Sequence, residues 1–99
     1  MTARPEVVCL CGSARFMPRM QELARELGLA GDIVLAPVDA ETAPTPQQKA
    51  TLDALHRHKI DLADRVLVVN PGGYVGESTA AEIAYARAAG RRVDFTDPR

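Results

Sequence analysis

Short apolar runs alternate along the chain with longer segments in which apolar residues recur every three or four positions. The runs are typical of strands buried on both faces of a sheet, and they lie at residues 6–11, 32–36, 65–70 and 93–96. The spacing of the longer segments predicts helices over residues 16–29, 46–63 and 78–89. Strands and helices therefore alternate, which favours a parallel sheet with right-handed crossovers.

This order predicts a single α/β domain over residues 1–99, since a chain of 99 residues has room for one core only. We expect a three-layer, Rossmann-like or flavodoxin-like open parallel sheet of four to five strands, with helices on both faces. In such a sheet the first and third strands are central neighbours. Ligands then bind beyond the carboxyl ends of these strands, where the strand order reverses.

Local signals indicate where the helices begin and which faces they bury. The segment T-P-Q-Q at residues 45–48 predicts a capping box, with a Thr cap, a Pro at the first helical position and a Gln at the third. The second helix carries the apolar residues Leu52, Leu55, Ile60 and Leu62, and His56 and Ile60 share one of its faces. In the third helix we expect Ile83, Ala84 and Ala88 on the inner face.

Composition excludes several classes of partner. The net charge is −1, from 12 basic and 13 acidic residues, so the chain has no broad footprint for polymeric nucleic acid. It contains no apolar run of the roughly 18–20 residues needed to cross a bilayer. The first residues, M-T-A-R-P-E, lack the apolar stretch of a secretion signal. We therefore expect a cytoplasmic protein without a membrane partner.

Cys9 and Cys11 lie two positions apart in the first predicted strand. They should share one face, too close along the chain for an easy disulfide. A metal site would need further ligands, and the chain has no other Cys, so we expect two small apolar packing residues and no metal site. Neither a G-K-[ST] phosphate loop nor a G-x-G-x-x-G fingerprint is present, and we expect no cofactor.

The loop after the first strand, G-S-A-R, is a candidate phosphate site. Gly12 lets the backbone approach a ligand closely, Ser13 offers a hydroxyl, and Arg15 offers a bidentate fork. The alternative is that Ser13 only caps the next helix and Arg15 is a surface charge.

The turn after the third strand holds three glycines, at positions 72, 73 and 76. A plain turn between a strand and a helix needs at most one glycine, so we count Gly73 and Gly76 as candidate substrate-binding residues. Ser78 and Thr79 follow at the start of the third helix, where capping is their ordinary role. A helix that begins here presents an anion-binding end to the cleft.

Glu82, in or just beyond the first turn of that helix, has two interpretations. It is either a solvated acid that gains about 0.3–1 kcal/mol from the helix dipole, or a carboxylate that the dipole keeps ionised and that points into the cleft. In the second case it is available as a nucleophile or as a stabiliser of an oxocarbenium ion. Glu77 is a rival, but it should lie in the turn and face solvent.

His56 lies on the helix before the third strand, in the segment L-H-R-H-K-I-D-L-A-D. A lone His is more often a surface or packing residue than a catalyst. The expected closeness of this helix to the cleft makes His56 a candidate nonetheless.

Three stretches together resemble the nucleoside 2-deoxyribosyltransferase-like superfamily, which includes deoxyribosyltransferases and nucleoside 5′-monophosphate N-glycosidases. They are C-G-S-A-R, A-D-R-V-L-V-V-N and G-x-S-T-A-A-E-I-A-Y-A, and the resemblance covers about residues 7–93. It implies that Glu82 is the nucleophile that captures the anomeric carbon. It also implies phosphate contacts from Gly12, Ser13 and Arg15, and sugar or phosphate contacts from Gly76, Ser78 and Thr79.

The chain departs from that family at one position. Active members carry an Asp eight residues before the Asp of the A-D pair, and here the count back from Asp64 reaches His56. An imidazole would then assist the departing base, unless Asp53 or Asp61 takes over by a shift.

The resemblance favours an N-glycosidase or 2-deoxyribosyltransferase that acts on a nucleoside or nucleoside 5′-monophosphate through a Glu nucleophile. The alternative is a non-catalytic nucleotide-binding or sensing module on the same fold, and a third reading is a structural domain whose glycine turn only packs. A chain this small should leave the cleft open at one side, so we expect a homodimer or a higher homo-oligomer.

Overall fold

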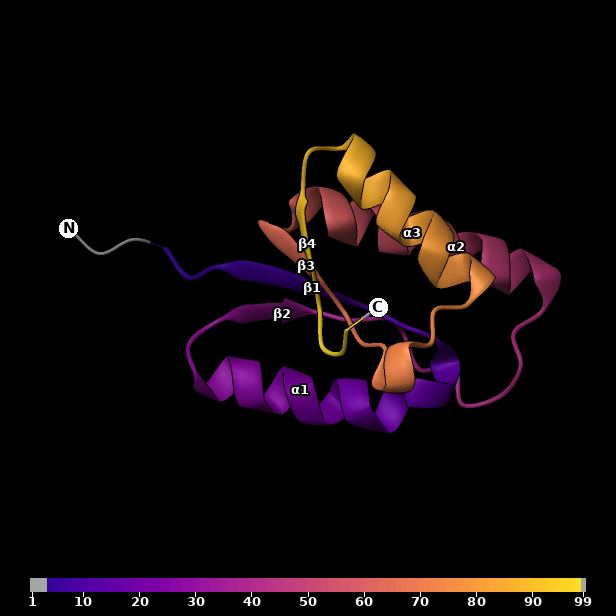
Figure 1. Cartoon of the computed structure of the whole chain (residues 1–99). Coiled ribbons are helices and arrows are strands. Elements are labelled where there is room, and N and C mark those ends of the chain that lie inside the picture. Colours follow the sequence, from indigo (N-terminus) through magenta and orange to yellow (C-terminus); the bar gives the residue numbers. More distant parts are fainter. Residues whose placement is uncertain (1–3, 99) are drawn as a thin grey trace.

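The computed structural model describes residues 4–98, in which strands and helices alternate as predicted (Figure 1). The elements are β1 (Val7–Cys11), α1 (Met17–Leu29), β2 (Ile33–Leu35), α2 (Pro46–Leu62), β3 (Arg65–Val68), α3 (Glu77–Ala88) and β4 (Arg92–Phe95). Two short 3-10 turns, η1 (Ala14–Phe16) and η2 (Pro71–Gly73), follow β1 and β3. Within the described residues no helix is long and apolar enough to span a bilayer.

The strands form one parallel sheet in the order β2-β1-β3-β4. β1 and β3 are the central neighbours, with Val8 opposite Arg65 and Cys11 opposite Val68. The chain leaves β1 toward one edge and leaves β3 toward the other, so the strand order reverses between them. The predicted Rossmann-like α/β architecture and its central pair are confirmed, with four strands in the described part of the chain.

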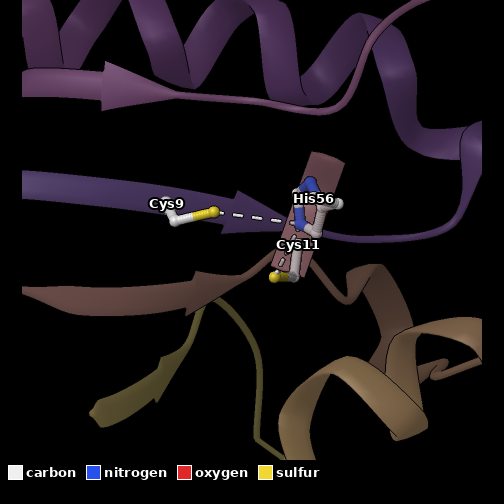
Figure 2. Close-up of side chains that lie close together, drawn as sticks. All are labelled: Cys9, Cys11 and His56. Carbon is white, nitrogen blue, oxygen red and sulfur yellow. Dashed lines mark hydrogen bonds between the residues drawn. The ribbon is translucent and has the colours of Figure 1, made fainter. Parts of the chain in front are cut away.

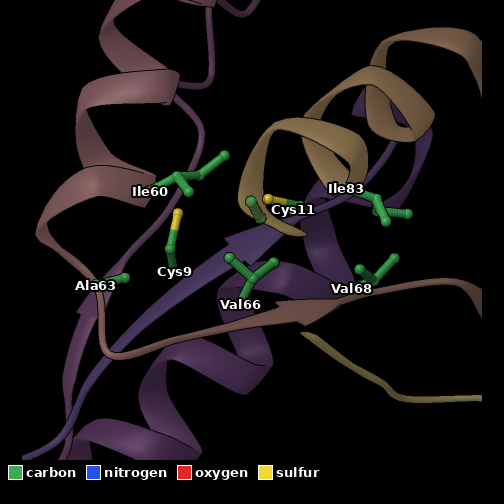
Figure 3. Close-up of a cluster of buried hydrophobic side chains, with 8 residues drawn as sticks. Cys9, Cys11, Ile60, Ala63, Val66, Val68 and Ile83 are labelled. Carbon is green, nitrogen blue, oxygen red and sulfur yellow. The ribbon is translucent and has the colours of Figure 1, made fainter. Parts of the chain in front are cut away.

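Helices cover both faces of the sheet, α1 on one side and α2 with α3 on the other (Figure 1). Because successive side chains of a strand point to opposite faces, Val8 and Leu10 pack toward α1, whereas Cys9 and Cys11 pack on the side of α2 and α3 (Figure 2). The core on this second side also holds Ile60, Ala63, Val66, Val68, Ile83 and Ala86 (Figure 3).

α2 buries the face that carries His56 and Ile60. Ile60 is fully buried, but Leu55 and Leu62 are 46% and 72% exposed. His56, Ile60 and Ala63 face the sheet instead, at the spacing of four and three that defines one side of the helix. The buried face of α2 therefore includes a histidine, which a count of apolar residues leaves out.

The buried face of α3 differs from the predicted one. Its buried residues are Thr79, Ile83 and Ala86, while Ala84 and Ala88 are exposed. Alanines occur all round this helix, so the apolar pattern does not single out a face.

One predicted cap is confirmed and another is wrong. The hydroxyl of Thr45 accepts from the N–H of Gln48 at 3.1 Å, and the Gln48 side chain accepts from the N–H of Thr45 at 3.0 Å. At α3 the capping residue is Gly76, and no side chain caps the helix. Thr79 is instead buried at 3% exposure, because it faces inward at the third position of the helix.

Asp64 fastens the N-terminal segment to the sheet and should make stability fall in acid. Its carboxylate accepts from the Arg4 guanidinium and, at 2.8 Å, from the N–H of Val7. These bonds, the one from Arg4 first, lower the pKa of Asp64 from 3.8 to about 2. Since the folded-state pKa is the lower one, the stabilisation is present above about pH 4 and is lost as the pH falls toward 2.

Denaturant unfolding of the wild type and of Asp64→Asn between pH 5 and pH 2 measures this contribution. We expect the difference in stability between the two proteins to shrink as the pH falls through this window. A difference that is constant with pH would contradict the assignment.

Candidate functional site

A cleft of about 750 Å³ opens at the carboxyl end of the sheet, at the reversal of strand order. Its walls come from the loop after β1, the segment 37–44 after β2, one side of α2 and the beginning of α3. The position agrees with the general rule for ligand sites in open parallel sheets.

Seven of the nine candidate residues line this one cleft. They come from three parts of the chain and are Gly12, Ser13, His56, Gly76, Ser78, Thr79 and Glu82. The other two, Arg15 and Gly73, lie outside it. The Arg15 guanidinium carbon stacks 4.1 Å from the ring centroid of Tyr74, which itself lines the cleft. Gly73 faces the C-terminal segment, since a Cβ there would lie 3.1 Å from the carbonyl oxygen of Pro98.

Gly12 is required by the packing of the protein itself. A Cβ at this position would lie 2.9 Å from the carbonyl oxygen of Val69 and 3.3 Å from the Met20 sulfur. Among the described residues no cap bond uses the Ser13 hydroxyl, which lines the cleft. Ser13 therefore reaches the cleft from a loop whose backbone packs closely against the residue that follows β3.

The glycine turn binds an anion that belongs to the protein. Gly72 and Gly73 have positive φ values of 67° and 84°, which favour glycine. The Gly72 N–H donates to the Asp97 carboxylate at 3.0 Å. Asn70, fully buried, fixes Asp97 by donating to its carbonyl at 3.1 Å and accepting from its N–H at 3.0 Å. The sequence reasoning missed Asp97, which lies 25 residues from the turn.

Glu82 lies in the cleft with its side chain only 20% exposed, so its interpretation as a solvated acid is wrong. Because α3 begins at Glu77, the helix dipole acts on Glu77, in the first turn, rather than on Glu82. Burial raises the pKa of Glu82, and the nearby charge of His56 opposes that rise. Glu77 is exposed and lines the same cleft from the first position of the helix, not from the turn.

His56 is a buried residue, 5% exposed, that lies between Glu82 and the two cysteines. Its Nε2 is 3.9 Å from Glu82 Oε1, 3.2 Å from Cys11 Sγ and 3.8 Å from Cys9 Sγ (Figure 2). Burial would lower its pKa, but the hydrogen bond with Cys9 and the charge of Glu82 leave the pKa of His56 raised. Its Nδ1 is buried without a hydrogen-bond partner among the described residues.

The cysteines are fully buried on one face of β1, as predicted. Their contact with His56 was missed, because Cys11 and His56 are 45 residues apart in the sequence. The pKa of Cys9 is lowered to about 6, chiefly because the Cys11 thiol can donate to its sulfur, while burial opposes the change. The same pairing raises the pKa of Cys11.

Charged residues of α2 complete the cleft and were also missed. Lys59 donates to the carbonyl of Ala36 at 2.7 Å, and Lys49 pairs with Asp53 at 3.0 Å. Of the two carboxylates considered as replacements for the family Asp, Asp53 lines the cleft. Asp61 does not line it and accepts instead from the Tyr85 hydroxyl at 2.8 Å.

The cleft combines a partly buried carboxylate beside an imidazole with hydroxyls, a helix N-terminus and lysines. In comparisons with known proteins, no protein-family model matches the chain and no curated protein shows significant similarity to it.

Proposed function

We propose that the protein cleaves the N-glycosidic bond of a nucleoside or nucleoside 5′-monophosphate, as an N-glycosidase or a 2-deoxyribosyltransferase. One observation carries the proposal: Glu82, partly buried in the cleft, lies 3.9 Å from His56 at the point where the strand order reverses. A carboxylate and a proton donor that both reach one glycosidic bond are the two groups that this chemistry needs.

In the proposed reaction, the Glu82 carboxylate attacks the anomeric carbon while the bond to the base nitrogen breaks. The bonding electrons leave with the base, and His56 donates a proton to it. Water, or a second base in the transfer reaction, then attacks the same carbon and releases Glu82. A proton returns to His56 from the incoming group. Partial burial of Glu82 supports this role, because electrostatic stabilisation is stronger where a group is shielded from water.

A 5′-phosphate suits the same cleft. The Ser13 hydroxyl and the N-terminus of α3 can donate to its oxygens, and Lys49 and Lys59 add positive charge to the lining of the cleft. The homo-oligomer expected from the sequence stays a prediction. It is supported by the apolar side chains of Val38 and Tyr74, which line the cleft and are 50% and 43% exposed.

Incubation with nucleoside 5′-monophosphates, their 2′-deoxy forms and the matching nucleosides tests the proposal, with released base measured by chromatography. We expect base release from at least one nucleotide, with a lower KM for the monophosphate than for its nucleoside. Addition of a second free base separates transfer from hydrolysis. Saturable nucleotide binding with no base released would overturn the enzymatic proposal and favour the non-catalytic binding module.

A further inference from the structure

Two buried cysteines contact His56, which lines the cleft, and the proposed reaction does not use the cysteines. The sulfurs of Cys9 and Cys11 and the Nε2 of His56 lie within 4.8 Å of one another (Figure 2). We propose that these residues form a binding site for Zn²⁺, with Glu82 as the fourth ligand. The inference does not rest on the proposed function.

The distances fit a four-coordinate zinc ion. With Zn–S near 2.3 Å and Zn–N or Zn–O near 2.0–2.2 Å, a tetrahedral site separates its ligand atoms by about 3.4–3.8 Å. The Nε2 of His56 lies 3.2 Å and 3.8 Å from the two sulfurs and 3.9 Å from Glu82 Oε1. The distances from Nε2 lie on both sides of the ideal spacing, so Cys9, Cys11 and His56 can bind an ion after small shifts. The Glu82 carboxylate does not belong to the group of ligand atoms within 4.8 Å of one another, so it must move closer to the sulfurs to become the fourth ligand.

The fold explains why these atoms converge. Residues two apart on a strand share a face, so β1 brings both sulfurs to the side that α2 covers. On α2, the seam that buries Ile60 also buries His56 one turn earlier. The Nε2 of His56 already faces both sulfurs, as a ligand nitrogen must.

The ligand types select the metal. Two thiolates and an imidazole suit zinc, whereas Mg²⁺ and Ca²⁺ prefer oxygen ligands. On binding, each thiol loses its proton to solvent as its sulfur–metal bond forms, and the two thiolates balance the charge of the ion. His56 and Glu82 line the cleft, so an ion that enters the cleft reaches them first.

The unpartnered Nδ1 of His56 limits the expected affinity. Histidines that bind metals almost always donate their other N–H to an acceptor, and loss of that partner typically costs 10–100-fold in affinity. No such acceptor bonds this atom among residues 4–98. We therefore expect weaker binding than at a structural zinc site whose histidine is supported.

Zinc at this site would compete with the proposed reaction. It would bind both His56 and Glu82, the two groups that cleavage of the glycosidic bond requires. The metal titration uses no nucleotide, so a protein that binds no metal could still be a glycosidase. In the same way, a protein that releases no base could still bind zinc.

Titration of the reduced, metal-free protein with Co²⁺ tests the site, with Co²⁺ as a spectroscopic probe for Zn²⁺. We expect one equivalent to produce thiolate-to-cobalt charge-transfer absorption and d–d bands of tetrahedral intensity, and Zn²⁺ to remove both. A folded wild-type protein without these bands would overturn the proposal, whatever the variants do.

Variants assign the ligands. Cys11→Ser and His56→Gln should each lower the affinity for Co²⁺ by more than about tenfold. The matched control is His58→Gln, because His58 lies on the same helix with its side chain 78% exposed. Equal loss in His58→Gln would overturn the site. Glu82→Gln should keep the charge-transfer band but weaken binding, and unchanged affinity would overturn Glu82 as the fourth ligand.

Discussion

We expect Glu82→Gln to lower the rate of base release on the order of 10³-fold or more, with little change in the overall fold. The amide keeps the size of the side chain but removes the negative charge that would capture the anomeric carbon. Because the side chain is only 20% exposed, solvent cannot easily replace it. The measurement is kcat/KM for the best nucleotide of the panel, with circular dichroism to confirm folding.

Glu77→Gln is the matched control. Glu77 lines the same cleft and carries the same charge, but it is exposed and lies at the first position of α3. We expect its loss to change kcat/KM by less than about tenfold, since it contributes only long-range charge in a screened position. Base release that survives Glu82→Gln, or that is lost equally in both variants, would contradict the assigned nucleophile.

The second large effect is on stability. We expect Ile60→Ala to lower the free energy of unfolding by about 2–5 kcal/mol, because it removes buried methyl and methylene groups and leaves a cavity. Ile60 is fully buried and belongs to the same core cluster as Cys9, Val66 and Ile83. Urea or guanidinium unfolding of the two proteins measures the difference.

Leu62→Ala is the control from the same helix. Leu62 is 72% exposed, so we expect its truncation to change stability by no more than about 0.5 kcal/mol. Both residues are apolar, so the sequence alone does not distinguish them. Equal losses would contradict the face of α2 that the structure buries.

Much of the fold follows from local features of the sequence. The apolar runs and periodic segments predict the order of strands and helices, and the four residues T-P-Q-Q predict the start of α2. Both signals can be read from the sequence because each acts within a few residues of the chain. The central pairing of β1 and β3 follows from general rules for parallel sheets rather than from any single residue.

The faces of the helices are less local. Leu62 has an apolar side chain and is exposed, whereas His56 has a polar ring and is buried. Which side of α2 faces the sheet depends on the whole set of contacts with β1 and β3. In α3, alanines occur on every side of the helix, so the sequence does not show which side is buried.

The sequence by itself determined that the loops after β1 and β3 meet at one cleft, and that Glu82 and His56 are the groups to examine there. Only the tertiary structure decided that the Asp97 carboxylate binds the glycine turn, that Arg15 stacks on Tyr74, and that two cysteines surround the His56 ring. The physical reason is distance along the chain. Hydrogen bonds, ring contacts and metal ligands join atoms that are close in space, whereas these partners lie 25 to 59 residues apart in the sequence. The sequence also does not show in which direction a side chain such as that of Arg15 points.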